Sequence, residues 1–192
     1  MPEQVSAVIM ASGRSSRYHK NKLLETVRGE TVIRRAIGAM IGGGFDPVLV
    51  VSGCREVLEA AAAMGAVPVE NPDTTDDTAV TVRLGVERVP EGNAGCALFV
   101  ADQPLFRPES AAGLLDCFLR EPDRICQVRS GTRRGNPVIF PRCLFGELKT
   151  LSPNQRGRTV IARHPDLLRF FEIPDERELR DLDTPEDLEN LR

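Results

Sequence analysis

The chain has 192 residues, of which 41% are hydrophobic, and this size and composition fit one domain with a sizeable core. Its 25 lysines and arginines are balanced by 28 aspartates and glutamates, and the formal charge of -3 excludes a global basic field that would hold nucleic acid. An anionic ligand must therefore be bound by a local cluster of cations.

The first apolar run, residues 5–12, follows a short start without a basic segment and is far shorter than a membrane span. We therefore expect a cytoplasmic protein with neither a targeting signal nor a membrane partner. The five cysteines are an odd number and form no C-x-x-C pair. Because they fall in apolar stretches, we expect reduced thiols in the core.

Short apolar runs alternate with helical patterns through the first half of the chain. The runs are too short for helices and most are bounded by Gly or Pro, which predicts strands at residues 5–11, 47–52, 66–69 and 96–101. Apolar residues at helical spacing predict helices at residues 31–41, 54–64 and 78–89. This alternation indicates a Rossmann-like α/β fold with a mainly parallel, twisted sheet flanked by helices.

The regular alternation of predicted strands and helices ends after Asp102. A helical pattern at residues 108–120 is followed by predicted strands at residues 124–130 and 137–140, with a turn rich in Gly and Arg between them. Neither an internal repeat nor a linker-like segment interrupts the chain, so we expect residues 1–192 to form a single domain.

The first predicted strand runs directly into a loop that carries small residues and four cations, SGRSSRYHKNK at residues 12–22. Gly13 permits a close backbone approach, and Arg17 and Lys22 would offset the charge of a triphosphate. Neither the G-x-x-x-x-G-K-[ST] nor the G-x-G-x-x-G motif can be read from Gly13, which excludes a standard P-loop or dinucleotide site. The alternative is a solvated basic turn.

One acidic residue follows a predicted strand at a place suited to a metal ion, and a second acidic string precedes a predicted helix. The strand at residues 96–101 ends in Asp102, at the edge of the sheet where ligands of open parallel sheets bind. Mg²⁺ takes oxygen ligands, usually one or two carboxylates together with substrate phosphates. The alternative for Asp102 is a turn-forming or N-cap residue before Pro104, and capping of a helix that begins at Pro185 explains much of the string at residues 181–188.

Four strings carry a resemblance to a known family. They are VIMASGRSSR at residues 8–17 with NKLL at 21–24, ADQPL at 101–105, GNPV at 135–138 and DLDTPEDL at 181–188. In this order and spacing the chain resembles the nucleotidyltransferases with a glycosyltransferase-A-like fold, and within them the molybdenum cofactor cytidylyltransferases. Each string alone is a weak signal, but the ordered set covers essentially the whole chain.

The resemblance implies Mg²⁺-dependent transfer of CMP from CTP, or GMP from GTP, to the phosphate of molybdopterin or molybdenum cofactor, with Mn²⁺ as an alternative ion. The acceptor phosphate would attack the α-phosphorus and release pyrophosphate without a general base. Residues from about 1 to 104 would bind the nucleotide and those from about 105 to 192 the acceptor. A molybdoenzyme or its maturation chaperone would be a further partner.

The resemblance also implies site residues. Arg17, Lys22 and Asp102 would be catalytic, and Asp102 and Asp183, the latter preferred over Asp181, would bind the metal. The nucleotide would contact Ala11, Ser12, Gly13, Arg14, Ser15, Arg17, Lys22, Asn71 and Thr78. Ala11 and Ser12 stand where related guanylyltransferases carry glycines, which favours CTP, while capping of the helix at residue 78 is the alternative reading of Thr78.

For the acceptor, the sequence places arginines and glycines in one predicted turn at residues 129–137, whose alternative reading is a solvated hairpin tip. The expected contacts are Arg134, Gly135, Asn136, Pro137 and Arg156. Tyr18 and His19 depart from the family's methionine and glycine in the first loop. The rival functions are transfer to another phosphorylated acceptor, such as a sugar phosphate, and non-catalytic binding of molybdenum cofactor by a chaperone.

Overall fold

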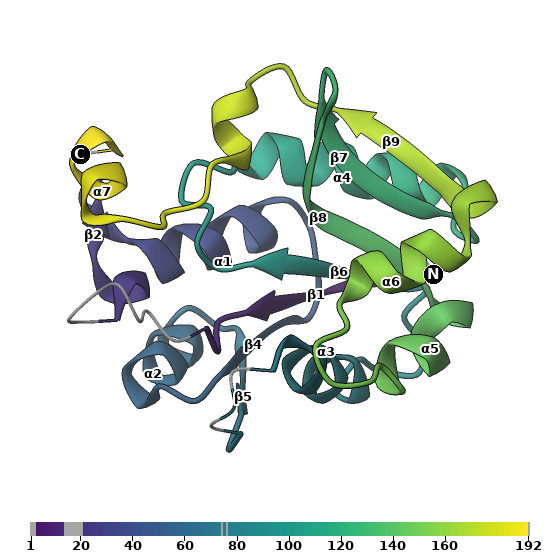
Figure 1. Cartoon of the computed structure of the whole chain (residues 1–192), viewed down its shortest axis with the longest axis horizontal. Coiled ribbons are helices and arrows are strands. Elements are labelled where there is room, and N and C mark those ends of the chain that lie inside the picture. Colours follow the sequence, from purple (N-terminus) through teal and green to yellow (C-terminus); the bar gives the residue numbers. More distant parts are fainter. Residues whose placement is uncertain (1–2, 14–20, 74, 76, 192) are drawn as a thin grey trace.

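The computed structural model describes residues 3–13, 21–73, 75 and 77–191, and one large sheet organises this part of the chain (Figure 1). Within the described residues its seven strands lie in the order β5-β4-β1-β6-β8-β7-β9. The strands are β1 (Val5–Met10), β4 (Val48–Ser52), β5 (Val67–Glu70), β6 (Gly95–Val100), β7 (Ile125–Ser130), β8 (Arg133–Pro141) and β9 (Leu168–Glu172). Strand β8 runs antiparallel to β6 and β7, and the other neighbours are parallel.

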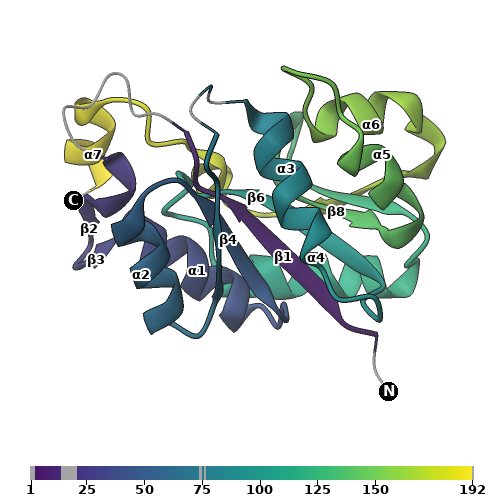
Figure 2. The same ribbon diagram turned by 90° about the horizontal axis from the view of Figure 1, so that it is seen from below.

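Helices cover both faces of this sheet, as Figure 2 shows. One face carries α1 (Val32–Gly42), α2 (Arg55–Ala63) and α4 (Pro108–Arg120), and the other carries α3 (Thr78–Glu87), α5 (Phe145–Lys149) and α6 (Gly157–Arg163). Successive side chains of a strand point to opposite faces, so Ala7 and Ile9 join the first apolar cluster and Val8 joins the second. The prediction of a mainly parallel sheet flanked by helices is confirmed.

The elements of the first half match their predicted positions closely. Strands β1, β4, β5 and β6 begin and end within one residue of the predicted bounds, and α1, α2 and α3 do so within two. A small two-stranded sheet of β2 (Thr26–Val27) and β3 (Glu30–Thr31) was not predicted. It follows the short 3-10 helix η1 (Lys22–Leu24), which brings Lys22 to the end of the main sheet.

The second half departs from the prediction at the arginine-rich turn. Residues 129–137 do not form one turn, because Ser130 and Arg133 are already paired across β7 and β8. Gly131, with φ +57°, lets the chain reverse over only two residues. Arg134, Gly135, Asn136 and Pro137 are therefore residues of strand β8 rather than of a loop.

The C-terminal segment passes back over the sheet to the first half. After β9 come the 3-10 helix η4 (Glu176–Leu179) and helix α7 (Pro185–Leu191), which begins at Pro185 as predicted. The remaining short 3-10 helices are η2 (Arg142–Leu144) and η3 (Pro165–Leu167). No helix among the described residues has the length and apolar character needed to cross a bilayer.

The five cysteines are free thiols, but they are not all core residues. Cys96 and Cys126 are buried, Cys54 and Cys117 are half-buried, and Cys143 is exposed. The prediction of a core position is therefore wrong for Cys143, which lies in η2 at the surface, where the chain turns after β8.

Candidate active site

A cavity of about 460 Å³ opens where β1 and β6 end. Its walls come from the loop after β1, from η1, from the first turn of α3, from β8 and from the start of α6. Most described site residues predicted from the sequence line it, namely Ala11, Ser12, Gly13, Lys22, Thr78, Asp102, Arg134, Gly135, Asn136 and Arg156. Residues separated by more than 140 positions in the sequence thus share one cavity.

Asp102 is held at the cavity edge by its own backbone and that of its neighbours. The N–H of Ala101 donates to the carbonyl of Met10 at 3.2 Å, which continues the pairing of β6 with β1. The carbonyl of Asp102 accepts from the N–H of Leu182 at 2.8 Å, which ties the C-terminal segment to this point. The carboxylate follows directly after a buried strand and faces Lys22.

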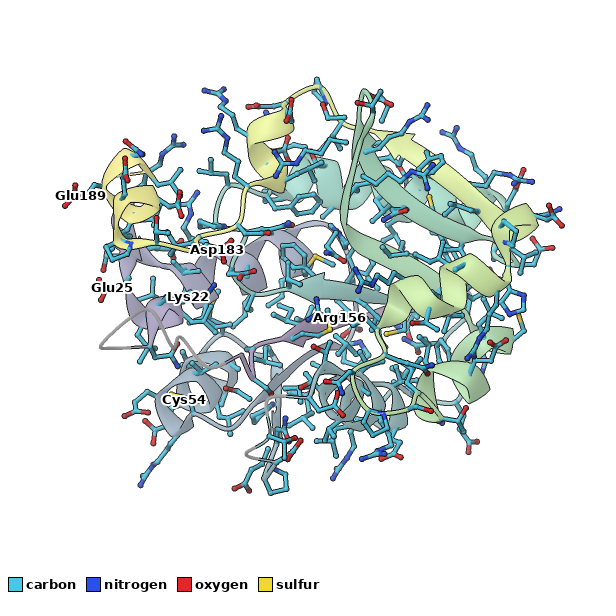
Figure 3. All side chains as sticks on the ribbon, in the orientation of Figure 1. Lys22, Glu25, Cys54, Arg156, Asp183 and Glu189 are labelled. Atoms are coloured by element: carbon cyan, nitrogen blue, oxygen red, sulfur yellow. The ribbon has the colours of Figure 1, made fainter. Side chains whose placement is uncertain are left out.

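Lys22 bridges two carboxylates from distant parts of the chain. Its Nζ lies 2.7 Å from Oδ2 of Asp102 and 3.5 Å from Oδ1 of Asp183. Figure 3 shows the Lys22 and Asp183 side chains on η1 and on the segment before α7. Burial opposes the charged form of Lys22, but the hydrogen bond and charge of Asp102, together with Asp183, raise its pKa above the ordinary value.

Asp183 rather than Asp181 points to this cation. Thr184 and Asp187 cap α7 reciprocally, since Asp187 Oδ2 accepts from the N–H of Thr184 at 2.7 Å and the N–H of Asp187 donates back to Thr184 Oγ1 at 3.2 Å. Asp181 instead accepts from Nε2 of Gln103 at 2.8 Å. Burial raises the pKa of Asp181, and the charges of Asp102 and Asp183 add to this effect.

The two carboxylates meet the first requirement of a divalent cation site. A single ammonium nitrogen touches both of them, so their oxygens converge on one cation position. Within the described part of the chain, no group of three or more His, Cys, Asp or Glu side chains could hold a metal alone. Asp102 and Asp183 therefore fit an ion such as Mg²⁺ that takes its other oxygens from substrate phosphates and water.

Asn71 supports the first loop from behind rather than lining the cavity. It is 5% exposed, and its Nδ2 donates to Ser12 Oγ at 3.0 Å and to Thr81 Oγ1 at 3.3 Å. Its Oδ1 accepts from the N–H of Asp73, and Ser12 Oγ in turn donates to the carbonyl of Val51. The amide of Asn71 is thus engaged in holding Ser12 in place.

Thr78 lines the cavity and is not the cap of α3. The cap is Asp77, whose Oδ1 accepts from the N–H of Ala79 at 2.9 Å. Gln127 also lines the cavity, although none of the sequence motifs includes it. It is the only uncharged polar residue in the otherwise apolar start of β7, and such an interruption is the signal that could have identified it.

Three arginines line the wall of the cavity that β8 and the start of α6 form. Arg134 belongs to β8, Arg156 is the N-cap of α6 and is labelled in Figure 3, and Arg158 lies one residue into that helix. Among the described residues none of the three has a carboxylate within ion-pair distance. Arg133, the neighbour of Arg134, turns away and pairs with Glu176 at 3.1 Å.

Some predicted contacts lie elsewhere. Pro137 and Asp183 are not among the residues that line the cavity, whereas Asn136 and Val138 are. Arg14, Ser15 and Arg17, together with the departures Tyr18 and His19, lie outside the described residues.

The sequence and the fold are both similar to those of nucleotidyltransferases. The sequence model of the MobA-like NTP transferase domain matches residues 7–167. Phosphoenolpyruvate guanylyltransferase of Rubrobacter xylanophilus is 30% identical over 174 residues, which cover 83% of this chain and 77% of that protein. The mainly parallel sheet with flanking helices is the glycosyltransferase-A-like nucleotidyltransferase fold.

Solved structures agree with this assignment. Rv0371c of Mycobacterium tuberculosis H37Rv is 26% identical, with a TM-score of 0.85 over 100% of this chain and 98% of that chain. A second structure of Rv0371c, in complex with manganese, aligns at 24% identity with a TM-score of 0.82 over the same shares of the two chains.

Proposed function

The chain belongs to the family of MobA-like NTP transferase domains, and on that premise we propose that it uses a divalent metal ion to transfer a nucleotidyl group to a phosphorylated acceptor. The observation that carries this proposal is the convergence of Asp102 and Asp183 on one cation position, which the ammonium of Lys22 occupies at the cavity wall. A protein that only bound a nucleotide or a pterin would gain little from two carboxylates at that point.

Asp102 and Asp183 would hold the metal ion, Mg²⁺ or Mn²⁺. When bound, the ion supplies charge neutralisation at the phosphates and at the departing pyrophosphate. The Rv0371c structure that contains manganese supports this choice of ion. The carboxylates come from the middle of the chain and from its C-terminal segment, so both parts must be folded before the pair exists.

The protein's own groups would position two anions and stabilise the charge that develops between them. An oxygen of the acceptor phosphate attacks the α-phosphorus, and the bond from that phosphorus to the bridging oxygen of the β-phosphate breaks. A phosphate monoester is an adequate nucleophile at neutral pH, so no side chain has to remove a proton. Lys22, and Arg17 from the loop outside the described residues, would stabilise the phosphates of the nucleotide.

The wall formed by Arg134, Arg156 and Arg158 would bind the acceptor, with the backbone of Gly135 and Asn136 close by. Guanidinium groups match phosphate and carboxylate in charge and in bidentate geometry. No carboxylate of the described chain neutralises these three arginines. Their positive charges would therefore all be available to bind an anionic acceptor.

The first loop favours CTP and molybdenum cofactor as the substrate pair. Ala11 and Ser12 both line the cavity, and their small but non-glycine side chains are the feature that resembles the cytidylyl branch. In this case the acceptor would be molybdopterin or molybdenum cofactor, and the product would pass to a molybdoenzyme or its maturation chaperone. We place the reaction in the cytoplasm, where nucleoside triphosphates are supplied.

A second candidate is guanylyl transfer to a small phosphorylated acid. It is favoured by the relative from Rubrobacter xylanophilus, whose described activity is that of a phosphoenolpyruvate guanylyltransferase. Both candidates use the same metal position and the same arginine wall, so they differ in base and acceptor rather than in mechanism.

The test is pyrophosphate release from CTP, GTP and ATP with Mg²⁺, each alone and with molybdopterin, molybdenum cofactor or phosphoenolpyruvate. Release from CTP that requires the pterin establishes the first pair, and release from GTP that requires phosphoenolpyruvate establishes the second. If the folded protein releases pyrophosphate with none of these, the proposal for both pairs is wrong and a binding role gains support.

A further inference from the structure

Two arginines face each other where β7 and β8 leave the cavity. Arg129 and Arg134 are directly opposite in the antiparallel pairing of these strands, so their side chains share one face of the sheet. Like charges in this position repel each other unless a neighbour compensates them. Strand β9, which lies beside β7 at the sheet edge in Figure 1, supplies the neighbours.

Strand β9 provides a carboxylate partner for Arg129 but only an aromatic ring for Arg134. Glu172 is paired with Arg129 in the parallel register and holds its guanidinium at 2.8 Å, while also accepting from the N–H of Gly131. Arg134 has no carboxylate partner among the described residues. Its contact on β9 is the ring of Phe170, whose centroid lies 4.9 Å from Arg134 Cζ and 4.8 Å from Arg129 Cζ.

The ring of Phe170 is not needed to fill the core. Phe170 belongs to neither of the two buried apolar clusters, whereas its neighbour Phe171 packs against the first of them from the opposite face of the strand. The aromatic ring of Phe171 fills the space above Gly113 of α4. An aromatic face within about 6 Å of a guanidinium attracts it through the negative charge of the π system.

We propose that Phe170 is a positioning residue for the acceptor site, because its ring lies against the guanidinium of Arg134, a residue of the cavity wall, while Glu172 compensates the charge of Arg129, which is not among the residues that line the cavity. This inference rests on the proposed acceptor role of Arg134. It makes β9 a functional part of the site, although the match to the family ends at residue 167, before this strand begins.

The kinetic test replaces the ring but keeps an apolar side chain. Phe170→Leu is expected to raise the KM for the acceptor about threefold to tenfold, with kcat and the KM for the nucleotide changed less than about twofold. Phe170→Tyr keeps the aromatic face and should retain the wild-type acceptor KM. Phe171→Leu, on the same strand but the opposite face, is the matched control and should alter thermal stability without a selective change in acceptor KM.

A double-mutant cycle separates this inference from the function on which it rests. If the ring acts through Arg134, Phe170→Leu has no further effect on the acceptor KM in an Arg134→Gln background. An Arg134→Gln variant with unchanged acceptor KM contradicts the proposed acceptor site itself. A raised acceptor KM in Arg134→Gln together with an unchanged one in Phe170→Leu overturns only the role of Phe170.

The contact can also be observed without turnover. Nuclei that lie over an aromatic face are shifted upfield in NMR spectra, so the side-chain resonances of Arg134 should move downfield in Phe170→Leu and keep their positions in Phe170→Tyr. Identical Arg134 resonances in wild type and Phe170→Leu would show that the ring does not hold this guanidinium, and the inference would be wrong.

Discussion

The two walls of the cavity differ in whether their charged side chains have partners of opposite charge. On the first wall the ammonium of Lys22 lies within 3.5 Å of the carboxylate of Asp102 and of that of Asp183, which adjoins the cavity without being among the residues that line it. On the second wall Arg134, Arg156 and Arg158 have no carboxylate partner among the described residues, and Arg134 rests on an aromatic ring.

This difference means that a ligand of the first wall has to displace a charged partner, whereas a ligand of the second wall does not. A metal ion that enters the first wall must compete with Lys22 for the same carboxylate oxygens. An acceptor that enters the second wall gains charge-assisted hydrogen bonds without displacing a partner. Under the proposed function, the first wall would therefore set the conditions for catalysis, and the second would select the acceptor.

The largest effect is expected when the first wall loses its central carboxylate. Asp102→Asn keeps the shape of the side chain but removes the charge that would bind the metal, and we expect kcat to fall by about a thousandfold or more. The melting temperature should change little, because the side chain faces the cavity. Asp116→Asn, at an exposed position of α4, is the control, and wild-type turnover by Asp102→Asn would refute the metal assignment.

The second prediction concerns the competition on the same wall. Lys22→Met should raise the KM for the nucleotide roughly tenfold or more, because a phosphate-binding cation is lost. In the absence of nucleotide, however, it should bind Mn²⁺ more tightly than wild type, since the ammonium no longer occupies the carboxylates. Titration followed by electron paramagnetic resonance measures this affinity, with the exposed Lys149→Met as control. Weaker Mn²⁺ binding by Lys22→Met would contradict the competition between Lys22 and the metal ion for the carboxylates.

A smaller and more selective effect is expected on the second wall. Arg156→Gln should raise the KM for the acceptor about fivefold to tenfold and leave that for the nucleotide nearly unchanged, because one of three guanidinium groups is removed. Arg163→Gln, at the other end of α6 and paired with Glu147, should have little effect. Steady-state kinetics with each substrate varied separately would test this. A raised KM for the nucleotide alone would instead assign Arg156 to nucleotide binding on the first wall.

The smallest effect is expected beneath the first wall, at Gln103. Its Oε1 is buried without a hydrogen-bond partner among the described residues, and its Nε2 donates only to Asp181. Gln103→Met removes one bond and one unsatisfied carbonyl together, so urea denaturation should give an unfolding free energy within about 1 kcal/mol of wild type.

Asn71→Leu provides the contrast to that variant, because both polar atoms of the Asn71 amide have partners in a buried network. It should lower the unfolding free energy by about 2 kcal/mol or more. Equal losses in the two variants would show that the unsatisfied carbonyl of Gln103 carries no cost.

The sequence predicted the first wall well because its evidence is local. Apolar runs ending in Gly13 and Asp102 locate the carboxyl ends of two parallel strands, and such ends must meet at one edge of the sheet. The contact of Asp183 with Lys22 depends on the path of the C-terminal segment, which local patterns do not specify. Only the resemblance to a family indicated it.

The sequence predicted the second wall less well because its evidence is cross-strand. A composition rich in Gly and Arg suggested a loop at residues 129–137, whereas only Gly131 and Thr132 form the turn and β8 begins at Arg133. Once Arg133 and Arg134 are strand residues, alternation sends one to Glu176 and the other to the cavity. The ring of Phe170 was missed because β9 was not predicted at all.

The most direct test of the account follows the α-phosphate itself. The protein is incubated with Mg²⁺, the acceptor that supports pyrophosphate release, and the corresponding nucleoside triphosphate labelled at the α-phosphorus. We expect the label to appear in the acceptor in a one-to-one ratio with pyrophosphate, and Asp102→Asn to abolish both. Release of inorganic phosphate with the label left in a nucleoside diphosphate would contradict nucleotidyl transfer.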